Sequence, residues 1–259
     1  MQELQFVRYE KRGHIAYVTI NRPEVLNALH PPAKAELARV WEDYAADPEL
    51  WVAILTGAGE RAFCAGDDLK YRAAQPEAAQ RATRPGAHPL DALAKPVIAA
   101  INGYAVGGGL ELALRCDIIV AAEHARFGLP EPRRGLLADD GGVTLLPRRI
   151  PYHLAMGLIL TGELISAPEA YRLGLVNEVV PSPELMPAAE RWAAAILECA
   201  PLAVQAAKQA VRSTLHMSPA SAQEALEWLP AVRRLRSSED YIEGPRAFAE
   251  KRRPCWRGR

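Results

Sequence analysis

The chain has 259 residues, enough for one large α/β domain or for a main domain with a small helical appendage. Its 31 basic and 31 acidic residues cancel, so the overall charge does not favour a nucleic acid or an anionic membrane as a partner. The four cysteines form no Cys-x-x-Cys pair, which argues against structural zinc or a disulfide framework and favours a reducing compartment.

The chain lacks the apolar runs that membrane targeting and insertion require. Met1 to Glu10 carries charges and has no long apolar core of the kind found in signal peptides. No uninterrupted apolar stretch reaches the ~18 residues expected of a membrane span. We therefore expect a soluble and cytoplasmic protein.

The first fifth of the chain alternates strand and helix signals. Val7–Glu10 and Ile15–Asn21 predict two short strands joined through Gly13. After a turn, apolar residues at helical spacing predict an amphipathic helix over Ala33–Ala46. A short apolar run predicts a buried strand over Val52–Thr56.

The middle of the chain begins with a polar stretch from Tyr71 to Pro89, whose weak periodicity predicts a mobile loop or a loosely held helix. Pro96–Ile101 then predicts another apolar strand. A run of three glycines opens a predicted helix over Leu110–Leu114, and Ile118–Ala121 predicts the strand that follows it.

The last third changes from mixed to purely helical signals. Ser166 with Glu169 forms a capping box, and Gly174 marks the end of that helix. Val176–Val180 is the last expected strand, because the Ala-rich sequence from about Glu184 onward carries only helical signals. This order predicts a βα core over residues 1–183 and a helical region over residues 184–259.

Several cofactor and nucleophile motifs are absent. Gly57-x-Gly59 is followed by Ala62 where a dinucleotide fingerprint needs glycine, and the triple glycine lacks the Lys-Ser/Thr pair of a P-loop. The six histidines are scattered, and no Gly-x-Ser-x-Gly elbow is present. We therefore expect neither a metal ion nor a nicotinamide cofactor.

Two glycine-bearing turns, Phe63–Leu69 and Asn102–Glu111, each follow an apolar strand. Glycine permits positive φ angles and close approach of a ligand to the backbone. A turn that opens a helix also directs free N–H groups outward, so two such turns could hold one carbonyl oxygen as an oxyanion. Tight turns and close helix packing explain the same glycines, so neither turn decides between the two interpretations alone.

Two glutamates stand beside these turns. Glu131 lies between two prolines amid apolar neighbours, and burial would raise its pKa toward values that suit proton transfer near neutrality. A solvent-exposed turn glutamate is the more common explanation of such a residue. Glu111, at the start of an apolar helix, is equally ambiguous on its own.

Taken together and in order, these segments resemble the enoyl-CoA hydratase/isomerase (crotonase) superfamily, in its hydratase or carnitinyl-CoA dehydratase-like branch. The matching segments are Asn21-Arg22-Pro23 with Asn27-Ala28-Leu29, Phe63 to Leu69, Lys95 to Gly103, Gly107 to Glu111, Cys116-Asp117-Ile118, Phe127 to Glu131, Gly141-Gly142, and Glu243-Gly244 with Phe248 to Arg252. The resemblance implies an α/β fold built as a crotonase-like spiral of ββα repeats with a C-terminal helical trimerisation region. It further implies a homotrimer or a hexamer, and an acyl-CoA thioester as substrate with no separate cofactor.

The resemblance also assigns catalytic groups. It places the two backbone N–H groups of an oxyanion hole on Asp67 and Gly108, and the two catalytic carboxyls of a hydratase on Glu111 and Glu131. One carboxyl takes a proton from water as it adds to the β-carbon, and the other controls the proton at the α-carbon. Two carboxyls that couple in this way keep one protonated while the other is ionised.

Contacts with coenzyme A are implied for two parts of the chain. By similarity they fall on Ala65, Asp68, Leu69, Lys70, Phe248 and Lys251. The C-terminal pair reaches the ribose-phosphate end of the coenzyme in the family, sometimes across a subunit boundary. A solvated basic tail is the alternative explanation of Lys251 and the arginines after it.

The chain departs from the hydratase pattern at two places. Asp67 stands where hydratases usually have a small residue, and we expect its carboxylate to cap the following helix. Ala138-Asp139-Asp140 replaces an uncharged Pro-Gly-Ala stretch. The dienoyl-CoA isomerase branch has a catalytic aspartate at the position of Asp139, and carnitinyl-CoA dehydratase relatives carry a similar acid.

Three functions follow from these residues. The leading hypothesis is an enoyl-CoA hydratase, which adds water in syn fashion to a 2-enoyl-CoA through an enolate, or dehydrates a 3-hydroxyacyl-CoA in reverse. The second is an enoyl- or dienoyl-CoA isomerase that uses Glu131 and Asp139. The third is a non-catalytic acyl-CoA-binding scaffold.

Overall fold

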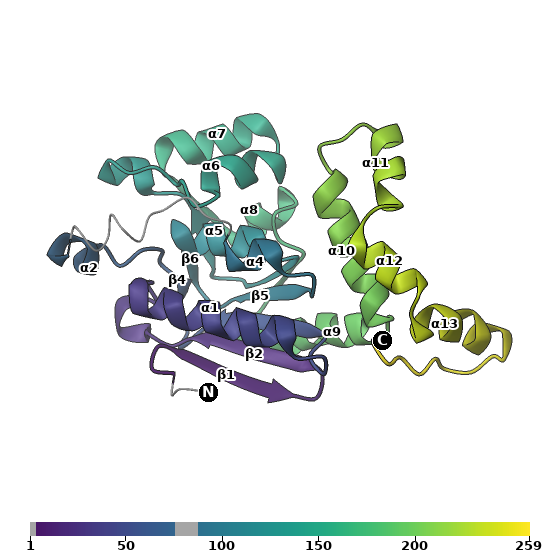
Figure 1. Cartoon of the computed structure of the whole chain (residues 1–259). Coiled ribbons are helices and arrows are strands. Elements are labelled where there is room, and N and C mark those ends of the chain that lie inside the picture. Colours follow the sequence, from purple (N-terminus) through teal and green to yellow (C-terminus); the bar gives the residue numbers. More distant parts are fainter. Residues whose placement is uncertain (1–3, 76–87) are drawn as a thin grey trace.

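Two β-sheets form the centre of the molecule in the computed structural model, which describes residues 4–75 and 88–259 (Figure 1). The larger sheet has the strand order β1-β2-β3-β5-β7-β10, and the smaller has the order β4-β6-β8-β9. The strands are β1 Val7–Arg12, β2 Ile15–Ile20, β3 Val52–Gly57, β4 Ala62–Cys64, β5 Val97–Ile101, β6 Tyr104–Val106, β7 Ile118–Ala122, β8 Arg126–Gly128, β9 Leu164–Ser166 and β10 Glu178–Val180.

Helices surround these sheets, and from α9 to α13 the chain is helical before a C-terminal segment without helix or strand, residues 253–259. The α-helices are α1 Pro31–Ala46, α2 Leu69–Ala74, α4 Pro89–Ala92, α5 Gly108–Arg115, α6 Gly142–Leu145, α7 Tyr152–Thr161, α8 Ala167–Arg172, α9 Leu185–Leu197, α10 Pro201–Thr214, α11 Pro219–Leu226, α12 Pro230–Arg236 and α13 Glu239–Ala249. Short 3-10 helices are η1 Pro23–Val25, η2 Glu131–Arg134, η3 Leu146–Arg148 and η4 Ser182–Glu184.

The central strands of the larger sheet, β3, β5 and β7, are buried on both faces. After the antiparallel hairpin of β1 and β2, its remaining pairings are parallel. Successive β3 residues alternate between two cores: Ile54 belongs to the cluster that includes α9, and Leu55 belongs to the cluster that includes α1 and the smaller sheet. A parallel strand covered on both faces is apolar at nearly every position, which explains the uninterrupted apolar run in β3.

The smaller sheet brings three loops to one edge. Strands β4, β6 and β8 are parallel neighbours, so their carboxyl ends lie at the same edge of the sheet. Gly66 follows β4, Gly107 follows β6 and Glu131 follows β8. Loops after neighbouring parallel strands therefore converge, and this edge is where a ligand is expected in such a sheet.

Two buried asparagines hold the turn that leads into β4. The side-chain amide of Asn27 donates to the carbonyls of Ala58 (3.0 Å) and Ala62 (2.7 Å). The amide of Asn102 donates to Gly57 (2.8 Å) and also to Ala62 (3.2 Å). These bonds satisfy carbonyl groups that the turn would otherwise leave buried without partners, and they place β4 ahead of the site loop.

Most of the long predicted elements are confirmed, with small differences at their ends. The N-terminal hairpin, the β3, β5 and β7 strands and the capping box of Ser166 and Glu169 are present. Helix α1 begins at Pro31, two residues earlier than predicted, because proline suits the first turn of a helix. Strand β10 begins at Glu178, two residues later than predicted.

The polar stretch from Tyr71 to Pro89 was predicted as a mobile loop or a loosely held helix. Its first residues, Tyr71 to Ala74, belong to α2, and Pro89 begins α4. Residues 76–87 lie outside the described part of the chain. The three-residue strands β4, β6, β8 and β9 were not predicted, because so short a run has no measurable periodicity.

The C-terminal helices extend away from the sheets. Figure 1 shows α10 to α13 at the right of the molecule, apart from α5 and α2, while α9 packs on the strands of the larger sheet. The predicted boundary between residues 1–183 and 184–259 stays a prediction. Among the described residues, no helix combines the length and the apolar character that crossing a membrane requires.

Candidate active site

Two backbone N–H groups meet where the loops after β4 and β6 approach each other. A β-carbon built on Gly66 would lie 2.8 Å from the nitrogen of Gly108, and one built on Gly108 would lie 3.7 Å from the nitrogen of Asp67. Neither Asp67 N–H nor Gly108 N–H donates to any acceptor in the described part of the chain. Gly108 is the first residue of α5, so the helix dipole lies behind its N–H group. The pair has the geometry of a preorganised anion site.

Glycine is required at two positions of this arrangement. Gly66 has φ +86°, and Gly107, the N-cap of α5, has φ +57°. Other residues adopt these angles only at a cost of ~1–2 kcal/mol. Side chains at either position would also fill the site, since a β-carbon on Gly107 would lie 2.8 Å from Glu131 Oε1.

Glu111 lies in the first turn of α5 and is 4% exposed. Its Oε1 accepts a hydrogen bond of 2.8 Å from the backbone N–H of Gly142, which opens α6. Its Oε2 lies 3.7 Å from the position of a β-carbon on Gly108. One carboxylate oxygen is therefore held, while the other faces the oxyanion donors.

Glu131 begins η2, immediately after the short segment that follows β8. It is half-buried, and its Oε2 is buried without a hydrogen-bond partner among the described residues. Buried polar atoms are rarely left without a partner, and such an atom often marks a functional site. The carboxyl of Glu131 lies against Gly107 and that of Glu111 against Gly108, so the two acids flank the turn that carries the anion site.

The pKa values of both carboxyl groups are raised above their usual value. The pKa of Glu111 is raised from 4.5 to about 7, mainly by burial and also by the Asp140 and Glu131 charges, while the Gly142 N–H and the Arg115 charge oppose the rise. Burial also raises the pKa of Glu131, with Arg134 acting against the rise and Asp67 and Asp139 adding to it. Proton transfer near neutrality requires acids with pKa values in this range.

The raised pKa of Glu111 makes a prediction about stability. An unfolded chain releases this proton near pH 4.5 and the folded chain near pH 7, so the folded state binds more protons in between and loses stability as pH rises through that window. Glu111→Gln removes the buried charge and should stabilise the protein by about 1–3 kcal/mol at about pH 8, with little effect near pH 5. Thermal unfolding of both proteins across this range measures the difference.

The control for this experiment is Glu163→Gln, because Glu163 has an exposed carboxylate in an ion pair with Arg133. Its effect on unfolding should stay small at every pH. If the difference between Glu111→Gln and the parent protein failed to grow as pH rises, Glu111 would not be the shifted group.

The expected role of Asp67 as a helix cap is wrong. Asp68, not Asp67, is the N-cap of α2, and it accepts from the backbone N–H of Tyr71 at 3.1 Å. The carboxylate of Asp67 points instead toward α1, where it pairs with Lys34 at 2.6 Å. The two aspartates are adjacent in the sequence, and it is Asp68 that has the extended N-cap conformation and accepts a helix N–H group.

The two acids that replace the uncharged hydratase stretch occupy different surroundings. Asp139 is exposed, and its charge acts on Glu131. Asp140 is also exposed, but its Oδ1 accepts from Arg115 at 3.0 Å and its charge acts on Glu111. The sequence pointed to both acids but missed Arg115, for which the only signal is its position four residues after Glu111.

The residues assigned to coenzyme A form two separate groups. Leu69 and Lys70 are exposed at the start of α2, and Asp68 beside them is engaged by Arg22 at 3.0 Å as well as by the helix. Ala65 is half-buried next to Gly66 and so adjoins the anion site. This first group therefore lies beside the site in the same chain.

The second group, Phe248 and Lys251, is not brought to the site within one chain. Phe248 lies on α13 and is 87% exposed, and Lys251 follows that helix. Figure 1 shows α13 at the far end of the molecule from α2 and α5.

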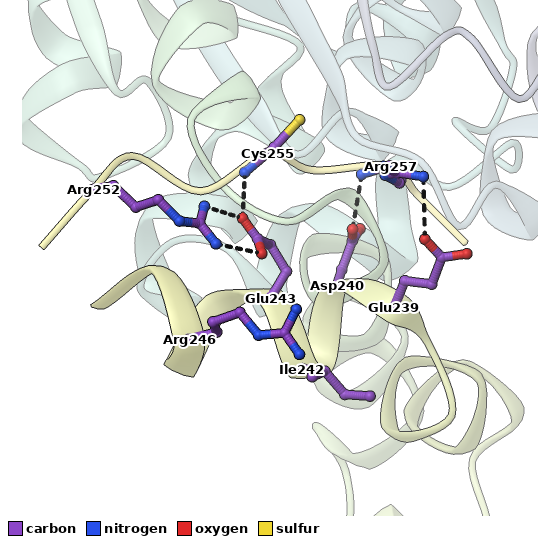
Figure 2. Close-up of a pocket in the computed structure, with 8 residues that line it drawn as sticks. All are labelled: Glu239, Asp240, Ile242, Glu243, Arg246, Arg252, Cys255 and Arg257. Carbon is purple, nitrogen blue, oxygen red and sulfur yellow. Dashed lines mark hydrogen bonds and ion pairs between the residues drawn. The ribbon is translucent and has the colours of Figure 1, made fainter. Parts of the chain in front are cut away.

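A cavity of about 420 Å³ lies beside α13 and contains none of the predicted site residues (Figure 2). Figure 2 shows the carboxylates of Glu243 and Asp240 directed at the returning C-terminal segment. Glu243 accepts from the Arg252 guanidinium and from the backbone N–H of Cys255, and Asp240 accepts from the backbone N–H of Arg257. These bonds give the two acids a structural role, because they anchor the C-terminal segment to α13. Within the described residues, no group of three or more potential ligands could hold a metal ion.

Comparison with known proteins agrees with this geometry. The family model for enoyl-CoA hydratase/isomerase matches residues 10–259. A crystal structure of an enoyl-CoA hydratase from Mycobacterium tuberculosis H37Rv is similar with a TM-score of 0.89 and 40% identity, over 98% of this chain and 99% of that one. The chain belongs to the enoyl-CoA hydratase/isomerase family, and the predicted crotonase-like α/β fold is confirmed.

Two curated relatives are named as a hydratase and a dehydratase of CoA compounds. The (E)-benzylidenesuccinyl-CoA hydratase of Thauera aromatica is 46% identical over 258 residues, which cover 97% of this chain and 99% of the relative. The carnitinyl-CoA dehydratase of Proteus mirabilis (strain HI4320) is 43% identical over 264 residues, covering 98% of this chain and 99% of the relative. The hydratase or dehydratase branch that the sequence indicated is thus confirmed.

Proposed function

We propose that this enzyme adds water to the double bond of a 2-enoyl-CoA thioester, or removes it from a 3-hydroxyacyl-CoA, through an enolate held by Asp67 N–H and Gly108 N–H. The observation that carries the proposal is the placement of two free N–H donors between the buried carboxyl of Glu111 and the half-buried carboxyl of Glu131. A thioester oxygen at the donors would place the α- and β-carbons beside these acids.

Charge on the thioester oxygen grows as the nucleophile attacks the β-carbon. Two aimed N–H groups in a site shielded from water stabilise that charge, and losing one such donor costs about 3–4 kcal/mol in other enzymes. Because the backbone donates, the unusual side chain of Asp67 leaves the donor in place. Its carboxylate is drawn away by Lys34, so it does not compete with the oxyanion.

The surroundings of the two acids support different roles. Burial raises the pKa of Glu111, but the N–H bond that it accepts from Gly142 opposes that rise and favours its ionised form, so Glu111 acts as the base that takes a proton from water. Glu131 has a partnerless buried oxygen and acts in its protonated form as the donor to the α-carbon. Hydroxide bonds to the β-carbon as the π electrons move toward the thioester oxygen, and the proton from Glu131 completes the product. Proton exchange with solvent then restores both acids.

The proposed substrate is an acyl-CoA thioester, and the proposed assembly is a homotrimer or a hexamer. Coenzyme A is part of the thioester, so the reaction requires no separate cofactor. Phe248 and Lys251, which lie far from Glu111 in their own chain, would contact the coenzyme of a neighbouring subunit in a homotrimer or hexamer. The named substrates of the relatives make a branched or substituted acyl group a reasonable probe beside a simple one. The cytoplasm is the proposed compartment, because free cysteines suit a reducing environment.

Incubation with crotonyl-CoA tests the function directly. Addition of water removes the conjugated double bond, so its ultraviolet absorbance should decline in proportion to enzyme. A panel of larger enoyl-CoA thioesters, followed by mass spectrometry for the gain of one water, covers the case of a narrow acyl pocket. Binding of every thioester without any turnover would support the scaffold hypothesis and refute the hydratase.

Asp139→Asn separates hydration from the isomerase alternative. The isomerase is a second candidate because the charge of Asp139 acts on Glu131. Asp139 is exposed, so we expect hydration to stay close to that of the parent enzyme, far from the ~10²–10⁴-fold loss caused by removing a positioned acid or base. The measurement follows hydration and double-bond position together by chromatography of the products. A double-bond shift that disappears in Asp139→Asn, with no hydration in either protein, would establish the isomerase.

A further inference from the structure

Arg115 is the last residue of α5 and lies one turn after Glu111. Its side chain is buried, and each of its three nitrogens donates a hydrogen bond within the chain. It is 8% exposed, and its Nη1 donates to the carbonyl of Glu111 at 3.2 Å and to the carbonyl of Asp140. Its Nη2 binds Asp140 Oδ1 at 3.0 Å, and its Nε binds Asp91 Oδ2 at 3.3 Å. A planar guanidinium with fixed donors is well suited to hold several acceptors in one arrangement.

The turn held by Arg115 is the one that supplies the hydrogen bond to Glu111. Gly141 has φ +107°, and a β-carbon on it would lie 2.6 Å from Arg115 Nη1, so the guanidinium packs directly on this backbone. The next residue, Gly142, donates its N–H to Glu111 Oε1 at 2.8 Å. One side chain thus connects the end of α5 to the group that orients the carboxylate at its beginning.

We propose that Arg115 is a positioning residue for Glu111. Arg115 clamps the Asp140–Gly142 turn so that the Gly142 N–H holds the carboxylate of Glu111. The opposite charges of Arg115 and Asp140 both act on that carboxylate. This role rests on the proposed function, because it explains how Glu111 is prepared to act as a base. Arg115 itself does not reach the anion site.

The charged groups around Glu111 come from several elements. Asp140 from the turn and Glu131 from η2 raise its pKa, and Arg115 from its own helix lowers it. Around Arg115 itself lie Asp91 of α4 and the partly buried His88 that caps that helix. Arg115 and Asp140 therefore act on the pKa of Glu111 with opposite signs while binding each other.

The test measures the titration of Glu111 in the ligand-free enzyme. Infrared spectroscopy detects the protonated carboxyl, and its loss in Glu111→Gln assigns the band. Arg115→Met should raise the pKa of Glu111 and Asp140→Asn should lower it, each by about 0.5–1 unit, since both partners act through a partly hydrated site. Arg115→Lys keeps the charge but loses the fork, so the pKa should stay near that of the parent while kcat falls and KM does not change.

The control pair is Arg12→Met and Glu10→Gln, because Arg12 and Glu10 form an exposed ion pair of 2.5 Å on β1, remote from the site. Neither should move the Glu111 band. Shifts in the same direction for Arg115→Met and Asp140→Asn, or shifts no larger than the controls, would overturn the proposal. If Arg115→Met does not fold, the exposed Asp140→Asn decides alone, and an unchanged or raised pKa overturns it.

The readout needs no substrate, so it separates this role from the function itself. Opposite shifts in an enzyme that hydrates no thioester would support the positioning of Glu111 and refute the hydratase. Hydration without opposite shifts of the Glu111 pKa would support the hydratase and refute the positioning role of Arg115.

Discussion

Replacing Glu131 or Glu111 by glutamine should lower kcat for hydration by about 10²–10⁴-fold, with little change in thioester binding. Glutamine keeps the shape of the side chain but can neither donate the α-proton nor take one from water. For Glu131 the loss is expected to be at the upper end, because the three atoms nearest to a β-carbon built on Gly107 all belong to its carboxyl group. Initial rates with crotonyl-CoA, together with the dissociation constant of a CoA thioester, measure the two effects separately.

The double variant is informative because the two acids act in one reaction. We expect Glu111→Gln combined with Glu131→Gln to lose little more activity than the worse single variant, since groups that act as a unit are not additive. Glu163→Gln, on the exposed ion pair with Arg133, should retain full activity. Hydration that survives either single substitution unchanged would remove that glutamate from the mechanism.

Gly66→Ala should lower kcat by about 10²–10³-fold, the usual effect of losing an oxyanion donor. The added methyl would lie 2.8 Å from the nitrogen of Gly108, where the thioester oxygen has to sit. It would also force a side chain onto a residue with φ +86°. Steady-state rates and thermal unfolding of the same preparations distinguish a blocked site from a weakened fold.

A matched control exists for the backbone strain. Gly174 has φ +76°, similar to Gly66, but a β-carbon on it would have no atom within 4 Å. Gly174→Ala should therefore show the cost in stability, about 1–2 kcal/mol, without the loss of activity. If the two alanine variants had equal activity, the free N–H of Gly108 would not be the site of oxyanion binding.

Local patterns predicted the elements that are long or carry a distinctive end. Examples are the apolar run of Val52–Gly57, the alternating hairpin and the capping box of Ser166. Each depends on residues that are close together in the sequence, so the folded chain contains it as predicted. The smaller sheet escaped prediction because Ala62–Cys64 and Tyr104–Val106 are too short to show a period. These strands are held by pairing with partners far along the chain, which a local pattern does not contain.

The same limit applies to the polar residues of the site. Neighbouring aspartates at 67 and 68 are equivalent as helix caps in the sequence, and the structure gives the cap to Asp68 and the ion pair with Lys34 to Asp67. Glu131 between two prolines was as consistent with an exposed turn as with an acid in a site. Its burial depends on the convergence of the loops after β6 and β8.

By itself the sequence determined the family of the protein, the order of its long elements and the residue types available for chemistry, because each of these is written in contiguous segments. Only the tertiary structure decided which of those residues share one site. Gly142 binds a carboxylate 31 positions earlier, and Arg115 grips a turn 25 positions later. Such contacts depend on strand order and packing, which set the distance between segments independently of the residues that lie between them.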